Sequence, residues 1–207
     1  MKKKVLICGA SGFIGRNLFE FLSEREDLDV YGTYLTNNDL NREPPHQRLW
    51  RVNFTDLESA RKITEGFDVI INAAAMTDGS GAVKARPEIY IAASNRINTN
   101  LIQAAYENKA PQFIFLSCTM MYPSSNRPLK EEESELTNIY AWIKVFAEQL
   151  CQFYSKLGKT KYTAIRHSNI YGPYDKFDLY RGHVFAATVT KAMTSANGGK
   201  IIMWGQG

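Results

Sequence analysis

Short apolar runs rich in β-branched and aromatic residues alternate with stretches of helical periodicity along the whole chain. Seven such runs predict strands, at residues 4–8, 30–34, 49–53, 69–73, 113–117, 162–166 and 201–204. Five amphipathic stretches predict helices, at residues 14–22, 57–63, 88–108, 140–154 and 184–195. Strands and helices that alternate in this way form a parallel sheet covered on both faces. The sequence therefore predicts a doubly wound α/β fold of about seven strands.

The predicted helix at residues 140–154 has two distinct faces. Its apolar stripe consists of Ile143, Phe146, Ala147, Leu150 and Phe153. Tyr140, Lys144 and Glu148 fall on another face, and the polar stretch at residues 124–138 before them reads as a surface loop. The tyrosine and the lysine therefore lie off the apolar stripe of this helix.

The first predicted strand runs directly into a glycine-rich segment. Gly9, Ala10, Ser11, Gly12, Phe13, Ile14, Gly15 and Arg16 follow Cys8, and the first helix begins among them. In this context the first glycine allows a tight turn, the second lets the backbone approach a pyrophosphate and the third permits close packing of helix and strand. The helix N-terminus adds N–H donors for phosphate. The segment predicts a dinucleotide site on a Rossmann-type sheet, the alternative being a glycine-rich turn without a ligand.

The end of the second predicted strand bears on which dinucleotide is bound. Sites selective for NAD place a carboxylate there for the ribose 2′-hydroxyl, but in this chain the residues from Gly32 to Asn38 include no acid, and the next one is Asp39. Arg16 or Arg42 could pair with a 2′-phosphate, unless both are simply solvated surface charges. The sequence favours NADP over NAD.

Tyr140 and Lys144 are four residues apart, so they lie on one face of a helix. A nearby ammonium favours the ionised phenol, whose ordinary pKa is ~10, and brings that pKa toward neutrality. Such a tyrosine can exchange a proton with a sugar or alcohol oxygen. Taken alone, the pair also fits a chance surface pair or a packed tyrosine.

Three further segments accompany the tyrosine and the lysine. The strand at residues 113–117 ends in Cys118-Thr119-Met120-Met121-Tyr122-Pro123, Asn169-Ile170-Tyr171-Gly172-Pro173 follows the next strand, and His183 comes after it. With the glycine loop and Asn72-Ala73-Ala74-Ala75, these segments resemble the extended short-chain dehydrogenase/reductase family of nucleotide-sugar enzymes, also called the NAD-dependent epimerase/dehydratase family. The spacing from Tyr140 to His183 and the closing Met203-Trp204-Gly205 are most similar to its GDP-L-fucose synthase branch.

The resemblance implies a role for each matching residue. Tyr140 would protonate the C4 oxygen of a 4-keto sugar, and Lys144 would lower the tyrosine pKa and bind the nicotinamide ribose. His183 would be an acid/base in epimerisation that also lies near the cofactor. In the family's pattern the nicotinamide end contacts Leu116, Asn169 and Ile170, and Lys191 helps to hold the sugar nucleotide. The same resemblance implies a homodimer.

Several of these positions have a plainer explanation. His183 stands at the start of an apolar helix, where a packed or capping histidine is common. Asp56 is either an adenine contact or the N-cap of the helix at 57–63.

Two positions depart from the family's pattern. The family's catalytic Ser/Thr is Cys118 here, and a thiol is the weaker hydrogen-bond donor, so its role either weakens or passes to Ser117 or Thr119. Alternatively, Cys118 is only a small buried residue. The epimerising cysteine of the fucose-synthase branch is Met120, which cannot transfer a proton. These departures favour reduction over epimerisation.

Composition and charge narrow the class further. The 207 residues suffice for one well-buried domain, at residues 1–207, but not for a full substrate domain as well, so a small C-terminal domain is expected to be missing. A net charge of +4 without a basic run interleaved with aromatic residues favours small anionic ligands over nucleic acid. No run approaches a membrane span. Cys8, Cys118 and Cys151 lack metal spacing and are typical of reduced cysteines in a cytoplasmic protein, with no metal site expected.

Three functions stay open. The first is an NADP-dependent reductase of the 4-keto group of a nucleotide sugar, GDP-linked by resemblance, with or without 3,5-epimerase activity. The second is an NAD-dependent nucleotide-sugar 4-epimerase. The third is a catalytically silent cofactor-binding protein. The sequence leaves the sugar and the base undetermined.

Overall fold

Six parallel strands form one sheet in the order β3-β2-β1-β4-β5-β6. The computed structural model describes residues 1–36, 48–76, 86–135, 139–179, 182–195 and 199–201. The strands are β1 (Lys3–Cys8), β2 (Leu28–Tyr34), β3 (Leu49–Arg51), β4 (Val69–Asn72), β5 (Gln112–Leu116) and β6 (Lys161–Ile165). The helices are α1 (Phe13–Ser23), α2 (Leu57–Thr64), α4 (Pro87–Glu107), α5 (Ile139–Lys156) and α6 (Val184–Thr194), with a 3-10 turn η1 (Glu131–Glu133).

This strand order confirms the doubly wound sheet. The chain first builds outward from β1 to β3 and then crosses back to β4, so the order reverses between β1 and β4. In open α/β sheets ligands bind outside the carboxyl ends of the strands at such a reversal. Six of the seven expected strands are present, and the seventh, at residues 201–204, lies outside the described residues except for Ile201, which is not in a strand.

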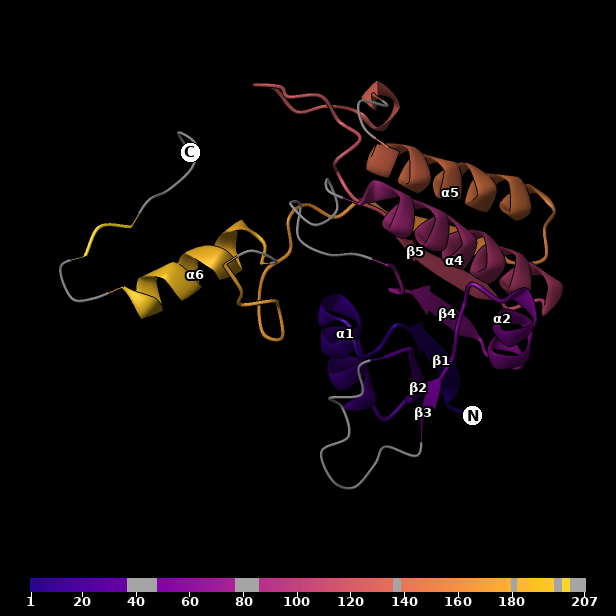
Figure 1. Ribbon diagram of the computed structural model, residues 1–207. Coiled ribbons are helices and arrows are strands. Elements are labelled where there is room, and N and C mark those ends of the chain that lie inside the picture. The colour runs from indigo at the N-terminus through magenta and orange to yellow at the C-terminus, as the bar shows by residue number, and fades with distance from the viewer. Residues whose placement is uncertain (37–47, 77–85, 136–138, 180–181, 196–198, 202–207) are drawn as a thin grey trace.

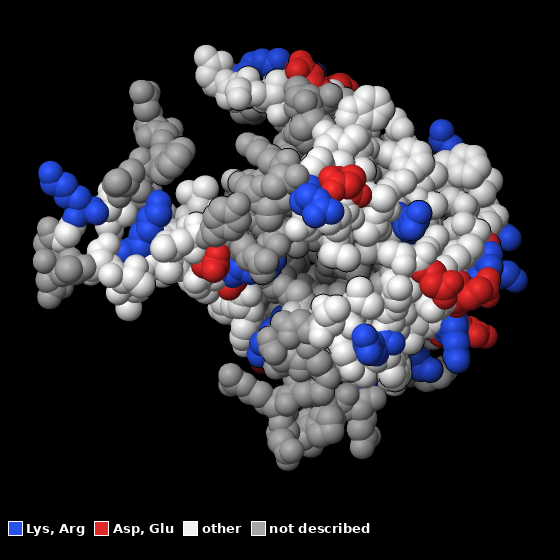
Figure 2. Space-filling model, in the orientation of Figure 1, with Lys and Arg blue, Asp and Glu red and all other residues white. Residues whose placement is uncertain are grey.

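Helices cover both faces of the sheet. In Figure 1, α2, α4 and α5 lie together on one face, α1 lies on the other, and α6 stands apart from the sheet. Charged side chains of both signs are scattered over the face in Figure 2. Among the described residues, no helix combines the length and the apolarity needed to cross a membrane.

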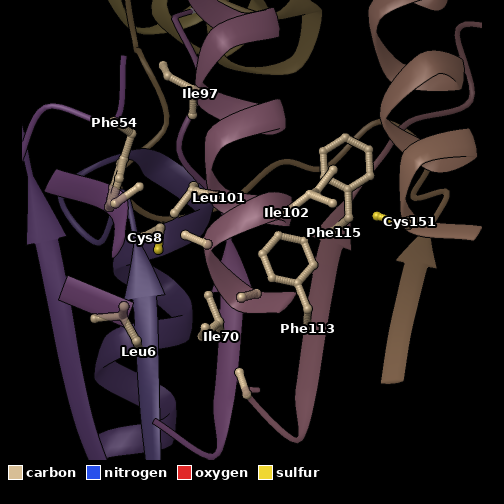
Figure 3. Close-up of a cluster of buried hydrophobic side chains, with 14 of the residues drawn as sticks. Leu6, Cys8, Phe54, Ile70, Ile97, Leu101, Ile102, Phe113, Phe115 and Cys151 are labelled. Carbon is tan, nitrogen blue, oxygen red and sulfur yellow. The ribbon is translucent and has the colours of Figure 1, made fainter. Parts of the chain in front are cut away.

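The alternation of side chains along β1 divides the core in two. Leu6 and Cys8 point to the cluster under α2, α4 and α5, which Figure 3 shows with Phe113 and Phe115 of β5. Val5 and Ile7 point to the opposite cluster, against Phe19 of α1 and residues of β2 and β4. β1 is therefore buried on both faces, as a central parallel strand should be, and the segment that follows it has a fixed starting point.

Candidate active site

The glycine loop between β1 and α1 is held by close backbone packing. Gly9 has φ +84°, and a Cβ there would lie 2.7 Å from the Cα of Ala74, after β4. A Cβ on Gly15 would lie 2.1 Å from the carbonyl oxygen of Gly9. Both positions therefore require glycine, because the loop, the start of α1 and the end of β4 touch through their backbones.

The outer side of the same loop is open. Gly12 is exposed and is the N-cap residue of α1, and no side chain caps the helix there. Ala10 is buried, while Ser11, Phe13 and Ile14 are half-buried. A cradle of glycines beside the N–H groups of a helix end fits the pyrophosphate of a dinucleotide.

Polar groups on the neighbouring strands β2 and β4 hold the glycine loop and the residues after β4 through hydrogen bonds. The backbone N–H groups of Gly9 and Ala10 donate to the side chain and the carbonyl of Thr33 on β2, at 3.1 and 2.7 Å. Asn72, at the end of β4, donates to Asn98 of α4 and accepts from the backbone of Ala74. The sequence reasoning missed Thr33 and Asn98. A polar residue inside an apolar strand was a usable signal for Thr33, but no local pattern marked Asn98.

Arg16 lies against its own helix and the segment after β6. Its Nε donates to Glu20 at 2.9 Å, and its guanidinium carbon lies 3.7 Å from the ring centroid of Tyr174. The neighbouring Asn17 donates to the carbonyl of Pro173 at 2.9 Å. Arg16 and Asn17 therefore connect α1 to Tyr174 and Pro173. Arg42, the other arginine considered for a 2′-phosphate, lies outside the described residues.

Tyr140 and Lys144 lie one turn apart near the start of α5. The Nζ of Lys144 donates to the carbonyl oxygen of Leu116 at 2.6 Å, where β5 ends, and lies 4.8 Å from the centroid of the Phe115 ring. Burial lowers the pKa of Lys144, while the nearby Cys118 and Glu148 act in the opposite direction. The hydroxyl oxygen of Tyr140 is also shielded from solvent. The structure thus brings Lys144, Leu116 and Cys118 together at the end of β5.

The segment after β5 contains the three residues considered for the role of the family's catalytic Ser/Thr, which are Ser117, Cys118 and Thr119. Ser117 is fully buried, and its Oγ has no hydrogen-bond partner among the described residues. Cys118 and Thr119 are half-buried, and Met120 is 54% exposed. Cys118 and Thr119 are therefore more accessible than Ser117.

A buried ion pair connects α5 to the end of β6. Arg166 donates to both carboxylate oxygens of Glu148, the closest contact being 2.6 Å. It also donates to the hydroxyl of Tyr122 at 2.6 Å and to the carbonyl of Glu131 at 2.7 Å. The guanidinium of Arg166 therefore links α5, the loop before α5 and the end of β6.

The remaining predicted contacts lie after β6. Asn169 and Ile170 are exposed. Lys191 lies in the last turn of α6. His183 is the N-cap residue of α6 but forms no side-chain cap. Its Nδ1 instead lies 3.3 Å from Asp175. No contact among the described residues joins His183 to Lys144, and Figure 1 shows α6 well away from α5.

Asp56 has the structural role that was one of its two expected roles. Its carboxylate accepts from the backbone N–H of Ser59 at 2.8 Å and from the Ser59 hydroxyl at 2.6 Å. These hydrogen bonds lower the pKa of Asp56. Asp56 is thus the N-cap of α2, which the sequence offered as one of two roles.

Comparison with known proteins agrees with this arrangement. Residues 5–207 match the family model "NAD dependent epimerase/dehydratase family". The chain is 28% identical over 213 residues to a GDP-mannose 3,5-epimerase of Arabidopsis thaliana, covering 99% of this chain and 56% of that protein. It is 27% identical over 217 residues to a GDP-L-fucose synthase of Escherichia coli, covering 100% of this chain and 63% of that protein.

A solved structure shows the same fold. The GDP-L-fucose synthetase of Naegleria fowleri bound to NADP superposes with a TM-score of 0.76 at 20% identity, over 99% of this chain and 66% of that chain. The chain thus spans less than two thirds of the length of the curated relatives named above. The match to the family model, the Rossmann-type sheet and the glycine loop together show that the chain belongs to the NAD-dependent epimerase/dehydratase family.

Proposed function

We propose that residues 1–207 form the cofactor-binding domain of an NADP-dependent oxidoreductase that reduces the 4-keto group of a nucleotide sugar. The observation that carries the proposal is the placement of Lys144, which is half-buried, bonded to the end of β5 and one turn from Tyr140. Such a constellation beside a dinucleotide loop suits proton transfer to a carbonyl oxygen.

The proposal assigns the dinucleotide to the glycine loop. Its pyrophosphate would contact residues 9–15, and its nicotinamide end would lie near Leu116, Asn169 and Ile170. A bound nicotinamide dinucleotide supplies hydride to the carbonyl carbon. We prefer NADP because the residues that end β2 include no carboxylate, and because the solved Naegleria relative contains NADP.

The chain's own residues handle the proton. Tyr140 donates its phenolic proton to the C4 oxygen as charge develops there. The ammonium of Lys144 stabilises the resulting phenolate, and the hydrogen bond to Leu116 keeps that ammonium in place. Lys191 is proposed to contact the pyrophosphate of the sugar nucleotide, which a cation favours.

The experiment is turnover of GDP-4-keto-6-deoxymannose with NADPH, followed by the loss of nicotinamide absorbance. Tyr140→Phe should lower kcat by a factor of about 10²–10⁴, because the proton donor is lost. Tyr154→Phe, on the same helix, is the matched control and should retain activity. A Tyr140→Phe variant that binds NADPH and turns over like the parent would contradict the proposal and favour a catalytically silent protein.

A second candidate, 3,5-epimerisation, is favoured by the curated relatives that are GDP-mannose 3,5-epimerases. In this chain Cys118 is the available thiol, since it is half-buried and close enough to Lys144 to act on the pKa of the lysine. Exchange of the C3 and C5 hydrogens of the sugar into deuterated water, without net oxidation of NADPH, tests it. Loss of exchange in Cys118→Ser would support epimerisation by Cys118.

We also propose that the chain forms a homodimer through α5. Trp142, Phe146 and Phe153 on this helix are 53%, 43% and 56% exposed, and Figure 2 shows few charges over it. Apolar patches of this kind mark protein interfaces, and a second copy presents the same patch. Light scattering of the parent chain and of Trp142→Glu tests it. A monomeric parent at micromolar concentration would contradict the dimer.

A further inference from the structure

We propose that Asp175 is the positioning residue of His183, which it holds in the Nδ1–H tautomer so that Nε2 is the proton-transferring nitrogen. The sequence offered Asp175 no role, because it lies eight residues before the histidine, in a loop. The effect of Asp175 on catalysis rests on the proposed function. Its effect on the tautomer of His183 does not.

The first observation is the burial of the Asp175 carboxylate. Its side chain is 2% exposed, although most of the surrounding residues from 171 to 179 are exposed. Aspartate is rarely this buried unless it is paired. Oδ1 accepts from the backbone N–H of Lys176 at 2.8 Å and faces Nδ1 of His183 at 3.3 Å, while Oδ2 is buried with no hydrogen-bond partner among the described residues.

The second observation is the backbone that brings His183 back to Asp175. A Cβ on Gly182 would lie 2.4 Å from the carbonyl oxygen of Asp178 and 2.5 Å from that of Lys176. The N–H of Gly182 donates to the carbonyl of Asp178 at 2.9 Å. The turn closes this tightly only with glycine, and the next residue is His183.

The third observation is the orientation of the imidazole. The side chain of His183 is 68% exposed, and it turns to Asp175 rather than capping α6. An ionised carboxylate can only accept hydrogen bonds, so Nδ1 must carry the hydrogen. In the neutral ring Nε2 then holds the lone pair and is the nitrogen left to solvent or substrate.

This arrangement has a clear chemical use. Nε2 can accept a proton from a sugar C–H or O–H group and return it in the reverse step. When Nε2 is protonated, the adjacent carboxylate stabilises the imidazolium, as in other Asp–His pairs. Asp175 itself touches neither substrate nor cofactor, so its role is to position the histidine.

The tautomer can be measured directly by long-range ¹H–¹⁵N NMR on the ¹⁵N-histidine-labelled chain at pH ~8.5, above the ordinary histidine pKa of ~6.5. The chain has only three histidines, so His183→Gln assigns the signal. We expect the Nδ1–H pattern for His183 in the parent. Asp175→Ala should shift this signal toward the other tautomer, whereas Asp178→Ala, on the same turn, should leave it unchanged. A parent His183 in the Nε2–H form, or an unchanged pattern in a folded Asp175→Ala variant, overturns the proposal.

Turnover separates positioning from a structural role. Asp175→Ala should lower the rate of exchange of the sugar C3 and C5 hydrogens, the proton transfer in which His183 would act, by about 10–100-fold, the range for groups that orient a reacting residue, with KM little changed. In a His183→Gln background the same substitution should cost nothing further, because the residue it positions is gone. Additive losses would overturn the assignment. If the parent turns over no keto sugar, the proposed function fails, but the NMR result still decides the role of Asp175.

Discussion

In the glycine loop the backbone itself fixes the geometry, whereas at His183 a single side-chain hydrogen bond does so. Gly9 and Gly15 lie against the backbone of their neighbours, between the buried strand β1 and the helix α1, which packs on the sheet through Phe19. His183 lies on an exposed turn before α6, whose Val184 and Met193 are 80% and 81% exposed. A phosphate cradle must be rigid and needs no titratable group, while an acid/base needs a defined tautomer and access to its substrate.

The contrast implies a large difference in stability between the sheet and α6. Phe113 of β5 is fully buried, so Phe113→Ala should lower the free energy of unfolding by about 3–5 kcal/mol. Phe185 of α6 is 48% exposed and packs on Tyr171, so Phe185→Ala should cost less than about 1 kcal/mol. Urea unfolding measures both. Equal losses would mean that α6 belongs to the core.

Arg166 and Glu148 join α5 to the end of β6, the last strand of the sheet before the segment that leads to α6. The side chains are 21% and 8% exposed, so Glu148→Ala leaves a guanidinium without its carboxylate and should cost about 3 kcal/mol. The exposed pair Arg61–Glu58 provides the control, since Glu58→Ala should leave the unfolding midpoint nearly unchanged. If Glu148→Ala were equally neutral, the pair would not hold the helix in place.

The tight packing of the glycine loop can be separated from its backbone conformation. Gly9 has φ +84° and Gly158 has φ +77°, but a Cβ on Gly158 would meet nothing within 4 Å. Gly158→Ala should therefore cost only the strain of the left-handed conformation, about 1–2 kcal/mol. Gly9→Ala should cost about 1–3 kcal/mol more, because its Cβ meets the backbone of Ala74. Equal thermal shifts in the two variants would show that the close approach is absent.

The smallest expected effect is a dependence of stability on pH. Burial lowers the pKa of Lys144 in the folded state below its unfolded value of ~10.4. As pH rises from the folded pKa toward ~10.4, the unfolded state holds the extra proton, so this group makes stability rise with pH. Lys144→Met removes that rise. The unfolding free energy of the parent minus that of Lys144→Met, measured from pH 8 to 10, should therefore increase with pH. A constant difference would contradict the burial of a charged lysine.

Much of the sheet and part of the site were predictable from the sequence. The strands and helices followed from short-range periodicity, and the glycine loop followed from residue types placed between an apolar run and a helix. Tyr140 and Lys144 were paired by helical spacing, and the structure places them one turn apart on α5. The choice between two roles for Asp56 was not predictable, because both use the same residue at the same place.

Partners far apart in the chain could not be found in this way. Lys144 bonds to Leu116, 28 residues away, and Arg166 reaches Tyr122 across 44 residues. The burial of Ser117 depends on how β5 lies inside the sheet, not on its neighbours in sequence.

The amino-acid sequence alone determined the alternation of strands and helices, the glycine cradle and the spacing of Tyr140 and Lys144, because each depends on residues within a few positions of one another. Tertiary structure alone decided that Lys144 is anchored at the end of β5, that Ser117 is buried and that Asp175 faces His183. These outcomes depend on which groups are buried together, and burial is a property of the packed molecule.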